Sequence, residues 1–346
     1  MTRRPRPTLA TVARHAAVSV ATVSKVLNGR ADVSAATRAR VELAMTEVGY
    51  LPSTPKRLFA AEPSLAVVFD SLANAYSAQV LEGVLAGASQ RGAEVCIDVL
   101  SAVPEGRPAP WTDEWIRRSV ARGRSGVVAV TTHVDDATAK LCAELGLPLV
   151  SVDPPRRPGP LTVSIGSTSY LGAVEGTEHL IALGHRRIAF LSGPASSDVN
   201  AERLAGCRSA LGSHGLPEPE ALVRATTMAQ AVADATMLLT GPDRATGLIC
   251  GNDVVALGAL EAARRVGLTI PADVSVVGFD DTHLAEWAVP PLTTVRQPIR
   301  EMGALAARTA LDLAAGQRPP ARHQQLSTTL VVRSSTGPAP EAQGAA

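Results

Sequence analysis

The chain of 346 residues is poor in cysteine and aromatic side chains, and it contains no long apolar run. Its four cysteines, Cys96, Cys142, Cys207 and Cys250, are widely separated and form no C-x-x-C pair, so they indicate neither a zinc site nor a redox motif. No run of about 18 apolar residues occurs, and the N-terminus lacks the apolar core of a signal peptide. We therefore expect a cytoplasmic protein without membrane contact, with no cofactor and no metal.

An excess of charge of one sign is also missing, since 33 Lys and Arg oppose 32 Asp and Glu. Residues 1–61 nevertheless carry ten basic and three acidic side chains, a net charge of +7. The other 285 residues carry 23 basic and 29 acidic side chains, a net charge of −6. A basic segment at one end of a mildly acidic chain favours binding of nucleic acid at that end only.

Common catalytic signatures are absent as well. The sequence contains no phosphate-binding G-x-x-x-x-G-K-[ST], no nucleophile elbow G-x-S-x-G, no zinc-binding H-E-x-x-H and no dinucleotide-binding G-x-G-x-x-G. The length exceeds what one ordinary core holds, so two or three domains are expected.

The first 50 residues predict three short helices and no strand. Apolar residues at helical spacing place these helices, each preceded by a capping Thr or Ser, at 9–16 after Thr8, 20–28 after Ser19, and 35–48 after Ser34. Two short helices joined by about three residues, with a third packed across them, form the helix-turn-helix plan. We therefore predict an all-α helix-turn-helix head at residues 1–50 and a hinge or linker at 51–63.

Beyond the linker, short apolar runs alternate with helical patterns. The runs are Leu65–Phe69, Val95–Leu100, Gly126–Thr131, Leu149–Val152, Arg187–Leu191, Leu248–Cys250 and Val274–Phe279. Such runs are typical of strands buried on both faces, and helices between them imply parallel strands joined by right-handed crossovers. The sequence therefore predicts an α/β core of doubly wound parallel sheets.

The runs fall into two sets, which predict two lobes within residues 64–335. We expect lobe 1 at about 64–163 plus 293–325, lobe 2 at about 164–292 plus 326–335, and a flexible tail at 336–346. A ligand is expected between the lobes, beyond the carboxyl ends of the strands.

Residues 8–28, TLATVARHAAVSVATVSKVLN, and their continuation to residue 52 closely resemble the DNA-binding head of the LacI/GalR family of bacterial repressors. The resemblance implies that the second helix enters the major groove. It further implies base contacts from Val20, Ala21 and Lys25, and phosphate contacts from Thr8, Ser19, Thr22, Ser24 and Asn28. The residues themselves leave two alternatives open: Val20 and Ala21 merely lie on the surface, and Lys25 contacts phosphate without reading a base.

Two positions depart from this family's pattern. The turn residue is Ala17, where the family usually has Gly. In the hinge, Arg57 keeps the family's arginine, while the position of the family's minor-groove leucine falls on Phe59, with Leu58 as second choice. An apolar wedge that kinks DNA can be either residue. The remaining alternative is that this segment is only a linker.

The remainder of the chain resembles the same family's effector domain, which is akin to periplasmic sugar-binding proteins. Residues 177–194, 202–206, 250–258, 274–281 and 290–294 carry this resemblance. It implies effector contacts from Tyr76, Asp153, Arg203, Asn252 and Asp280. Carboxylates, amides and the guanidinium fork suit the paired hydroxyls of a sugar, and an aromatic ring can stack on one. Alternatively, Arg203 and Asn252 serve only the lobe interface.

Together these patterns predict a sequence-specific transcriptional regulator, not an enzyme, that represses carbohydrate-utilisation genes and is released by a small sugar. We expect a homodimer, with a tetramer left open, on a pseudo-palindromic double-stranded operator. The contacts between the two subunits are expected to include the helix from Ser77 to Gln90, whose small residues allow close approach.

Three alternatives stay open at this point. In the first, the ligand is a corepressor or the protein is an activator. In the second, the chain is a transport-type sugar-binding protein, which the basic head and missing signal peptide oppose. In the third, it is a sugar-metabolising enzyme, either a glycosidase using Asp153 and Asp280 or a sugar kinase, although no phosphate loop is found.

Overall fold

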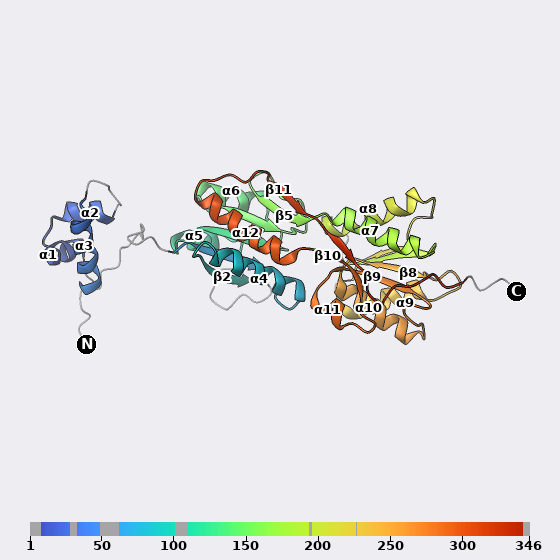
Figure 1. Ribbon diagram of the computed structural model, residues 1–346. Helices are drawn as coiled ribbons and strands as arrows, with labels where there is room; N and C mark the ends of the chain where they lie inside the picture. The colour runs from blue at the N-terminus through green and yellow to red at the C-terminus, as the bar shows by residue number, and fades with distance from the viewer. Residues whose placement is uncertain are drawn as a thin grey trace.

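The computed structural model describes residues 8–27, 33–48, 62–100, 110–193, 196–225 and 227–341. Along this part of the chain, a helical head precedes two α/β lobes (Figure 1). Of the predicted DNA contacts, Asn28, Arg57, Leu58 and Phe59 lie outside the described residues. In the described ranges, no helix is both long and apolar enough to cross a lipid bilayer.

The head contains the three predicted helices, α1 (Leu9–His15), α2 (Val20–Leu27) and α3 (Ala35–Val48). Their packing buries a small core that includes Val12, Val23 and Val41. Side-chain oxygens of Thr8, Ser19 and Ser34 accept hydrogen bonds from backbone N–H groups three residues later, which satisfies the helix N-termini as predicted. Each such cap contributes about 0.5–2 kcal/mol to helix stability.

The turn between α1 and α2 uses the left-handed conformation. Ala17 has φ of 53° and is exposed. An L-residue with a Cβ pays about 1–2 kcal/mol for this conformation. The chain therefore carries strain at the position where a glycine would relieve it.

Lobe 1 is built on a six-stranded parallel sheet in the order β11-β5-β4-β3-β1-β2. The strands are β1 (Ser64–Phe69), β2 (Glu94–Val99), β3 (Gly126–Val130), β4 (Leu149–Val152), β5 (Val163–Ser167) and β11 (His323–Leu326). Helices α4 (Ala75–Ser89) and α12 (Ile299–Ala314) cover one face, while α5 (Asp113–Ala121) and α6 (Asp136–Glu144) cover the other. Every residue of β1, β3 and β4 is buried, as continuous apolar runs predict.

Lobe 2 repeats this plan in the order β12-β10-β9-β8-β6-β7. Its strands are β6 (Ile188–Ser192), β7 (Ala221–Val223), β8 (Gly247–Cys250), β9 (Ser275–Asp280), β10 (Thr293–Arg296) and β12 (Thr329–Val331). Helices α7 (Ser169–Ala182) and α8 (Asp198–Ser213) cover one face, α9 (Met228–Leu239) and α10 (Asp253–Arg265) cover the other, and α11 (His283–Trp287) follows β9. The edge strand β12 is antiparallel to β10, which is an exception to the predicted parallel order.

The lobe boundaries differ from those expected. β5 pairs with β4 and β11, so residues 164–167 belong to lobe 1, whereas β10 pairs with β9, so residues 293–296 belong to lobe 2. The chain crosses between lobes after β5, β10 and β11 (Figure 1). These residues were assigned to the wrong lobe because neither segment was predicted as a strand, and only hydrogen bonding to a neighbour decides which sheet a strand joins.

The flexible tail was expected to begin at residue 336, but the residues that follow contact lobe 2. His185 Nε2 lies 3.2 Å from the Gly337 carbonyl oxygen, and Ala339 N–H donates to the Leu183 carbonyl at 2.8 Å. Residues 336–339 are therefore fastened to lobe 2 by polar contacts that no local pattern predicts.

Small residues of α4 pack inside the same chain. A Cβ added at Gly83 would lie 2.0 Å from the Arg300 carbonyl oxygen, and one at Gly87 would lie 2.5 Å from that of Ala304. The small residues at 77–90 were expected to allow close approach of two subunits. At these two glycines, however, the close approach is between α4 and α12 of one chain. The opposite side of α4 exposes Leu85.

Candidate functional site

The first candidate site is the outward surface of α2. Val20, Ala21 and Lys25 are exposed, whereas Val23 and Val26 are buried against the other helices. Ser19 caps the helix, and its hydroxyl lies 2.8 Å from that of Thr22. The N-terminus of α2 and its basic residue are therefore presented on one open face, the arrangement that a recognition helix needs.

The predicted phosphate-contacting residues also have local roles. The Thr8 hydroxyl accepts from Thr11 N–H at 3.4 Å, and Thr8 N–H donates to Thr11 Oγ1 at 3.2 Å, a capping box that begins α1. Ser24 is half-buried in α2. These contacts fix the helix ends, where the N–H groups that the caps leave unpaired and the helix dipole favour an anion.

The second candidate site lies where the carboxyl ends of both sheets meet. On the lobe 1 side, Tyr76 in the first turn of α4 donates its hydroxyl proton to Asp153 Oδ2 at 2.6 Å. Asp153 directly follows β4 and has φ of 41°, a strained backbone of the kind found at functional sites. Asn74 caps α4 by accepting from Ser77 N–H at 2.7 Å, which places Tyr76 beyond the sheet edge.

On the lobe 2 side, Arg203 and Asp280 form a buried pair. Arg203 Nη2 lies 3.8 Å from Asp280 Oδ1, and Arg203 Nη1 donates to the Gly251 carbonyl. The guanidinium also lies 3.7 Å from the centre of the Phe279 ring, which limits its movement. Asp280 ends β9 with φ of 107°.

Electrostatic effects show that these four side chains converge. Burial raises the pKa of Tyr76 well above its ordinary value, and the charges of Asp153 and Asp280 raise it further. Burial raises the pKa of Asp153, opposed by the Tyr76 hydrogen bond and by Arg203. Burial raises the pKa of Asp280 to about 8, opposed first by Arg203. The cluster thus offers acceptors and donors in a largely dry space, as recognition of hydroxyl groups requires.

Asn252 differs from the other predicted effector residues. Its side-chain oxygen accepts from Val255 N–H at 2.8 Å and so caps α10. The residue is half-buried beside Gly251, whose carbonyl holds Arg203. Its neighbour Asp253 is buried and accepts from Thr282 N–H at 2.7 Å and Thr294 Oγ1 at 2.7 Å, so this carboxylate joins elements of lobe 2.

Sequence reasoning missed Gln297, which bonds to members of both lobes. Gln297 Nε2 donates to Asp280 Oδ1 at 2.6 Å, and its side-chain oxygen accepts from Ser167 at 2.5 Å. Gln297 directly follows β10, as Asp153 follows β4 and Asp280 ends β9. The available signal was a polar residue at a strand end, but it went unused because the strand itself was not predicted.

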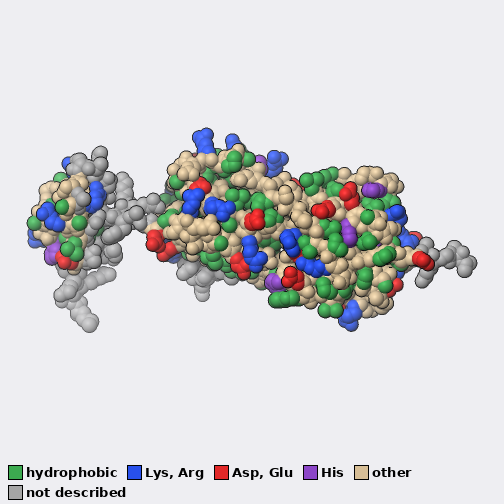
Figure 2. Space-filling view, in the orientation of Figure 1, with side chains coloured by type: hydrophobic (Ala, Val, Ile, Leu, Met, Phe, Trp, Pro, Cys, Tyr) green, Lys and Arg blue, Asp and Glu red, His purple; other side chains and the backbone are tan. Residues whose placement is uncertain are grey.

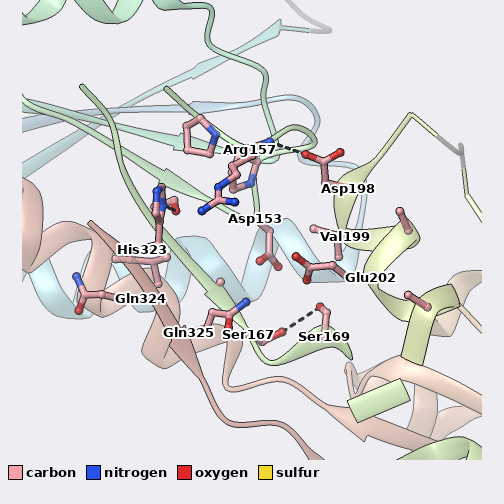
Figure 3. Close-up of a pocket in the computed structure, with 17 residues that line it drawn as sticks. Asp153, Arg157, Ser167, Ser169, Asp198, Val199, Glu202, His323, Gln324 and Gln325 are labelled. Atoms are coloured by element: carbon pink, nitrogen blue, oxygen red, sulfur yellow. Dashed lines mark hydrogen bonds between the residues drawn. The ribbon is translucent and has the colours of Figure 1, made fainter. Parts of the chain in front are cut away.

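A pocket of about 690 Å³ opens beside this cluster (Figure 3). Lobe 1 contributes the segment after β4 together with β5 and β11, and lobe 2 contributes the first turns of α8. Arg157 N–H donates to Asp198 Oδ2 at 2.6 Å across it, so the two lobes touch at its rim.

The head and the core together define a class of protein, a bacterial regulator in which a DNA-binding domain is joined to a periplasmic-binding-protein-like domain. Residues 8–53 match the family model of bacterial regulatory proteins of the lacI family. Residues 177–336 match the model of a periplasmic binding protein-like domain.

Whole-chain comparisons agree with these matches. The HTH-type transcriptional regulator CelR of Thermobifida fusca is 33% identical, and the alignment covers 97% of this chain and 100% of that protein. A structure of a CelR–cellobiose complex has a TM-score of 0.68 and 31% identity, covering 95% and 100% of the two chains. The lac repressor dimer bound to operator and the anti-inducer ONPF has a TM-score of 0.71 and 31% identity, covering 96% and 100%. The chain belongs to the LacI family of bacterial transcriptional regulators, and these relatives are DNA-binding regulators, not enzymes.

Proposed function

We propose that this protein is a transcriptional repressor that binds a DNA operator and dissociates from it when a small neutral sugar binds. The observation that carries the proposal is the presence, in one chain, of an exposed, capped recognition helix and a buried Tyr76–Asp153–Arg203–Asp280 cluster between two lobes. The first reads DNA and the second senses the effector. We place the protein in the cytoplasm, associated with the nucleoid while bound to its operator.

The basic head supplies affinity and register on DNA. Residues 1–61 have a net charge of +7, which favours phosphate contacts with salt-dependent affinity. Val20, Ala21 and Lys25 are the base-reading residues, and Thr8, Ser19, Thr22, Ser24 and Asn28 contact phosphates. Arg57 and the wedge, Phe59 or Leu58, act in the hinge.

The cluster between the lobes supplies effector recognition. The carboxyl oxygens of Asp153 and Asp280 accept from sugar hydroxyls, Arg203 and Asn252 donate to the sugar oxygens, and Tyr76 provides a ring face. Because these residues come from both lobes, a ligand that contacts them all prefers the closed arrangement. Such a preference is what allows ligand to shift DNA affinity, typically by about 1–3 kcal/mol.

The active species is a homodimer, because two heads are needed to cover a pseudo-palindromic operator. An exposed apolar residue, Leu85 on α4 of lobe 1, and a shallow groove on lobe 2 lined by Met228, Leu257 and Val289 support this assembly. The relative bound to operator is itself described as a dimer.

The decisive experiment is footprinting of a selected operator with and without sugars, using the full-length protein. Cellobiose is the first probe because a relative is described in complex with it. We expect Arg203→Ala to bind operator normally and to lose release by the sugar. Arg208→Ala, an exposed arginine on the same helix, should behave like the natural protein. Tighter operator binding with sugar would make the ligand a corepressor, and absence of duplex binding at low salt would contradict the proposal.

A further inference from the structure

The pocket beside the effector cluster contains polar groups that the proposed function does not use. We call it the outer pocket, and the groups that matter are Asp153, Arg157, Asp198, Glu202 and Gln325. Its volume of about 690 Å³ lies within the range of small-molecule sites, about 300–1,000 Å³. In Figure 3 the carboxyls of Asp153 and Glu202 face each other, and Arg157 and Gln325 project toward the same space.

Asp153 belongs to both the effector cluster and the outer pocket. Its Oδ2 accepts from Tyr76 within the cluster. Its Oδ1 lies against Gly166 in the pocket wall, since a Cβ added at Gly166 would stand 3.0 Å from that oxygen. One carboxylate therefore belongs both to the effector cluster and to the wall of the outer pocket, and a single ligand spanning both would contact its two oxygens.

The first turns of α8 also contribute one residue to the effector cluster and another to the outer pocket. Arg203 is buried and points to Asp280, whereas the preceding residue Glu202 is exposed and lines the outer pocket. Consecutive helical residues project about 100° apart, so Arg203 reaches the effector cluster while Glu202 reaches the outer pocket. Partial desolvation of the Glu202 carboxyl in the pocket raises its pKa, and the charge of Asp153 raises this pKa further, which places the two carboxyls within electrostatic reach.

The charge of the outer pocket restricts what can bind there. Three carboxyl groups, Asp153, Asp198 and Glu202, oppose the one arginine Arg157. A phosphorylated ligand would be repelled, whereas hydroxyl groups can donate to the carboxylates and accept from Arg157 and the amide of Gln325. Pro154, Pro158 and Val199 add apolar wall against which a ring can pack.

We propose that the outer pocket is a second saccharide subsite, which holds an uncharged sugar ring joined to the ring bound in the Tyr76–Asp153–Arg203–Asp280 cluster. The effector is therefore a neutral disaccharide or longer oligosaccharide. A single monosaccharide leaves the outer pocket empty, and a sugar phosphate does not enter it. This inference rests on the proposed function as a sugar-responsive regulator.

The test is calorimetric titration of the full-length protein with neutral disaccharides and their component monosaccharides, beginning with cellobiose, maltose and glucose, and with glucose 6-phosphate. We expect one disaccharide to bind at least about tenfold more tightly than its monosaccharide. Arg157→Ala and Glu202→Gln should each weaken disaccharide binding about tenfold and leave monosaccharide binding unchanged. Arg157→Ala preserves the contact to Asp198, because that contact uses the backbone N–H.

Arg156→Ala is the matched control, since Arg156 is exposed next to Arg157 but does not line the pocket. It should change neither affinity. Equal binding of disaccharide and monosaccharide, equal losses for both in the two variants, or tight binding of glucose 6-phosphate would overturn the subsite and leave the sugar-responsive function standing. If no saccharide binds the natural protein, the proposed function fails and the subsite fails with it.

Discussion

Gln297 joins Asp280 to Ser167, bringing together residues that end strands in different lobes. Its amide donates to Asp280 Oδ1 at 2.6 Å and its carbonyl accepts from Ser167 Oγ at 2.5 Å, and all three residues are buried. Since Gln297 lies in the crossover between β10 and α12, this one side chain fixes both the orientation of Asp280 and the relation of the lobes at that crossover.

Replacing Gln297 by Ala should lower the free energy of unfolding by about 1–3 kcal/mol, because Asp280 and Ser167, both buried, each lose a short hydrogen bond. Urea denaturation at constant pH measures the change. Gln317→Ala, at an exposed position after α12, is the control and should shift the free energy by less than about 0.5 kcal/mol. Similar small effects for both variants would show that water replaces the Gln297 contacts at no cost.

Ala17→Gly should stabilise the head by about 1 kcal/mol, because glycine adopts φ of 53° without the Cβ penalty. Hydrogen exchange of α1 and α2 in the full chain should slow accordingly. Ala10→Gly in the first turn of α1 is the matched comparison, and it should speed exchange, since glycine in a helix costs up to about 1 kcal/mol relative to alanine. If both substitutions speed exchange, the left-handed turn is not strained.

Lys25→Ala should weaken operator binding by about 1–3 kcal/mol and relax the preference at one base pair, because an exposed lysine of α2 can donate to guanine O6 or N7. Selection from a random duplex library gives the operator, and titration of single-base variants measures the relaxation. Lys140→Ala on lobe 1 is the control and should leave affinity unaltered. A loss that is uniform across all sequences would assign Lys25 to phosphate contact instead.

The stability of the core should decrease as the pH rises from about 6 to 8. Asp280 has an ordinary pKa near 3.9 when unfolded, and burial raises it to about 8 in the native state. The native state therefore holds more protons between these values, so the free energy of unfolding falls as pH increases toward 8. Burial also raises the pKa of Asp253, to about 6, so this residue lowers the free energy of unfolding with rising pH only below about pH 6.

Asp280→Asn should flatten the pH dependence between about 6 and 8 and reduce the slope between about 4 and 6 without abolishing it, because asparagine does not titrate and Asp253 still does. Urea midpoints at constant ionic strength, measured from pH 5 to 9, provide the comparison. Asp136→Asn at the start of α6 controls for the loss of one surface carboxylate. An unaltered slope between pH 6 and 8 would mean that Asp280 is ionised throughout.

The sequence predicted correctly those strands whose residues form a continuous apolar run, because such a run indicates burial on both faces of the sheet. β1, β3 and β4 are continuous apolar runs and are buried at every residue. Five strands were missed, β5, β7, β10, β11 and β12, and three of them, β7, β11 and β12, are short edge strands with partly exposed residues; β11 reads HQQL. Such segments become strands because a neighbouring strand offers hydrogen bonds, which no local pattern records.

The amino-acid sequence by itself determined the helix-turn-helix head, the two-lobed α/β class and the opposite charges of head and core, because helix caps, apolar periodicity and charge are local properties. Only the tertiary structure decided that Tyr76 meets Asp153, that Gln297 links Asp280 to Ser167, and that β10 belongs to lobe 2. These relationships join residues from about 17 to 130 positions apart. Their formation depends on the strand order and the crossovers, which the chain settles only when the sheets assemble.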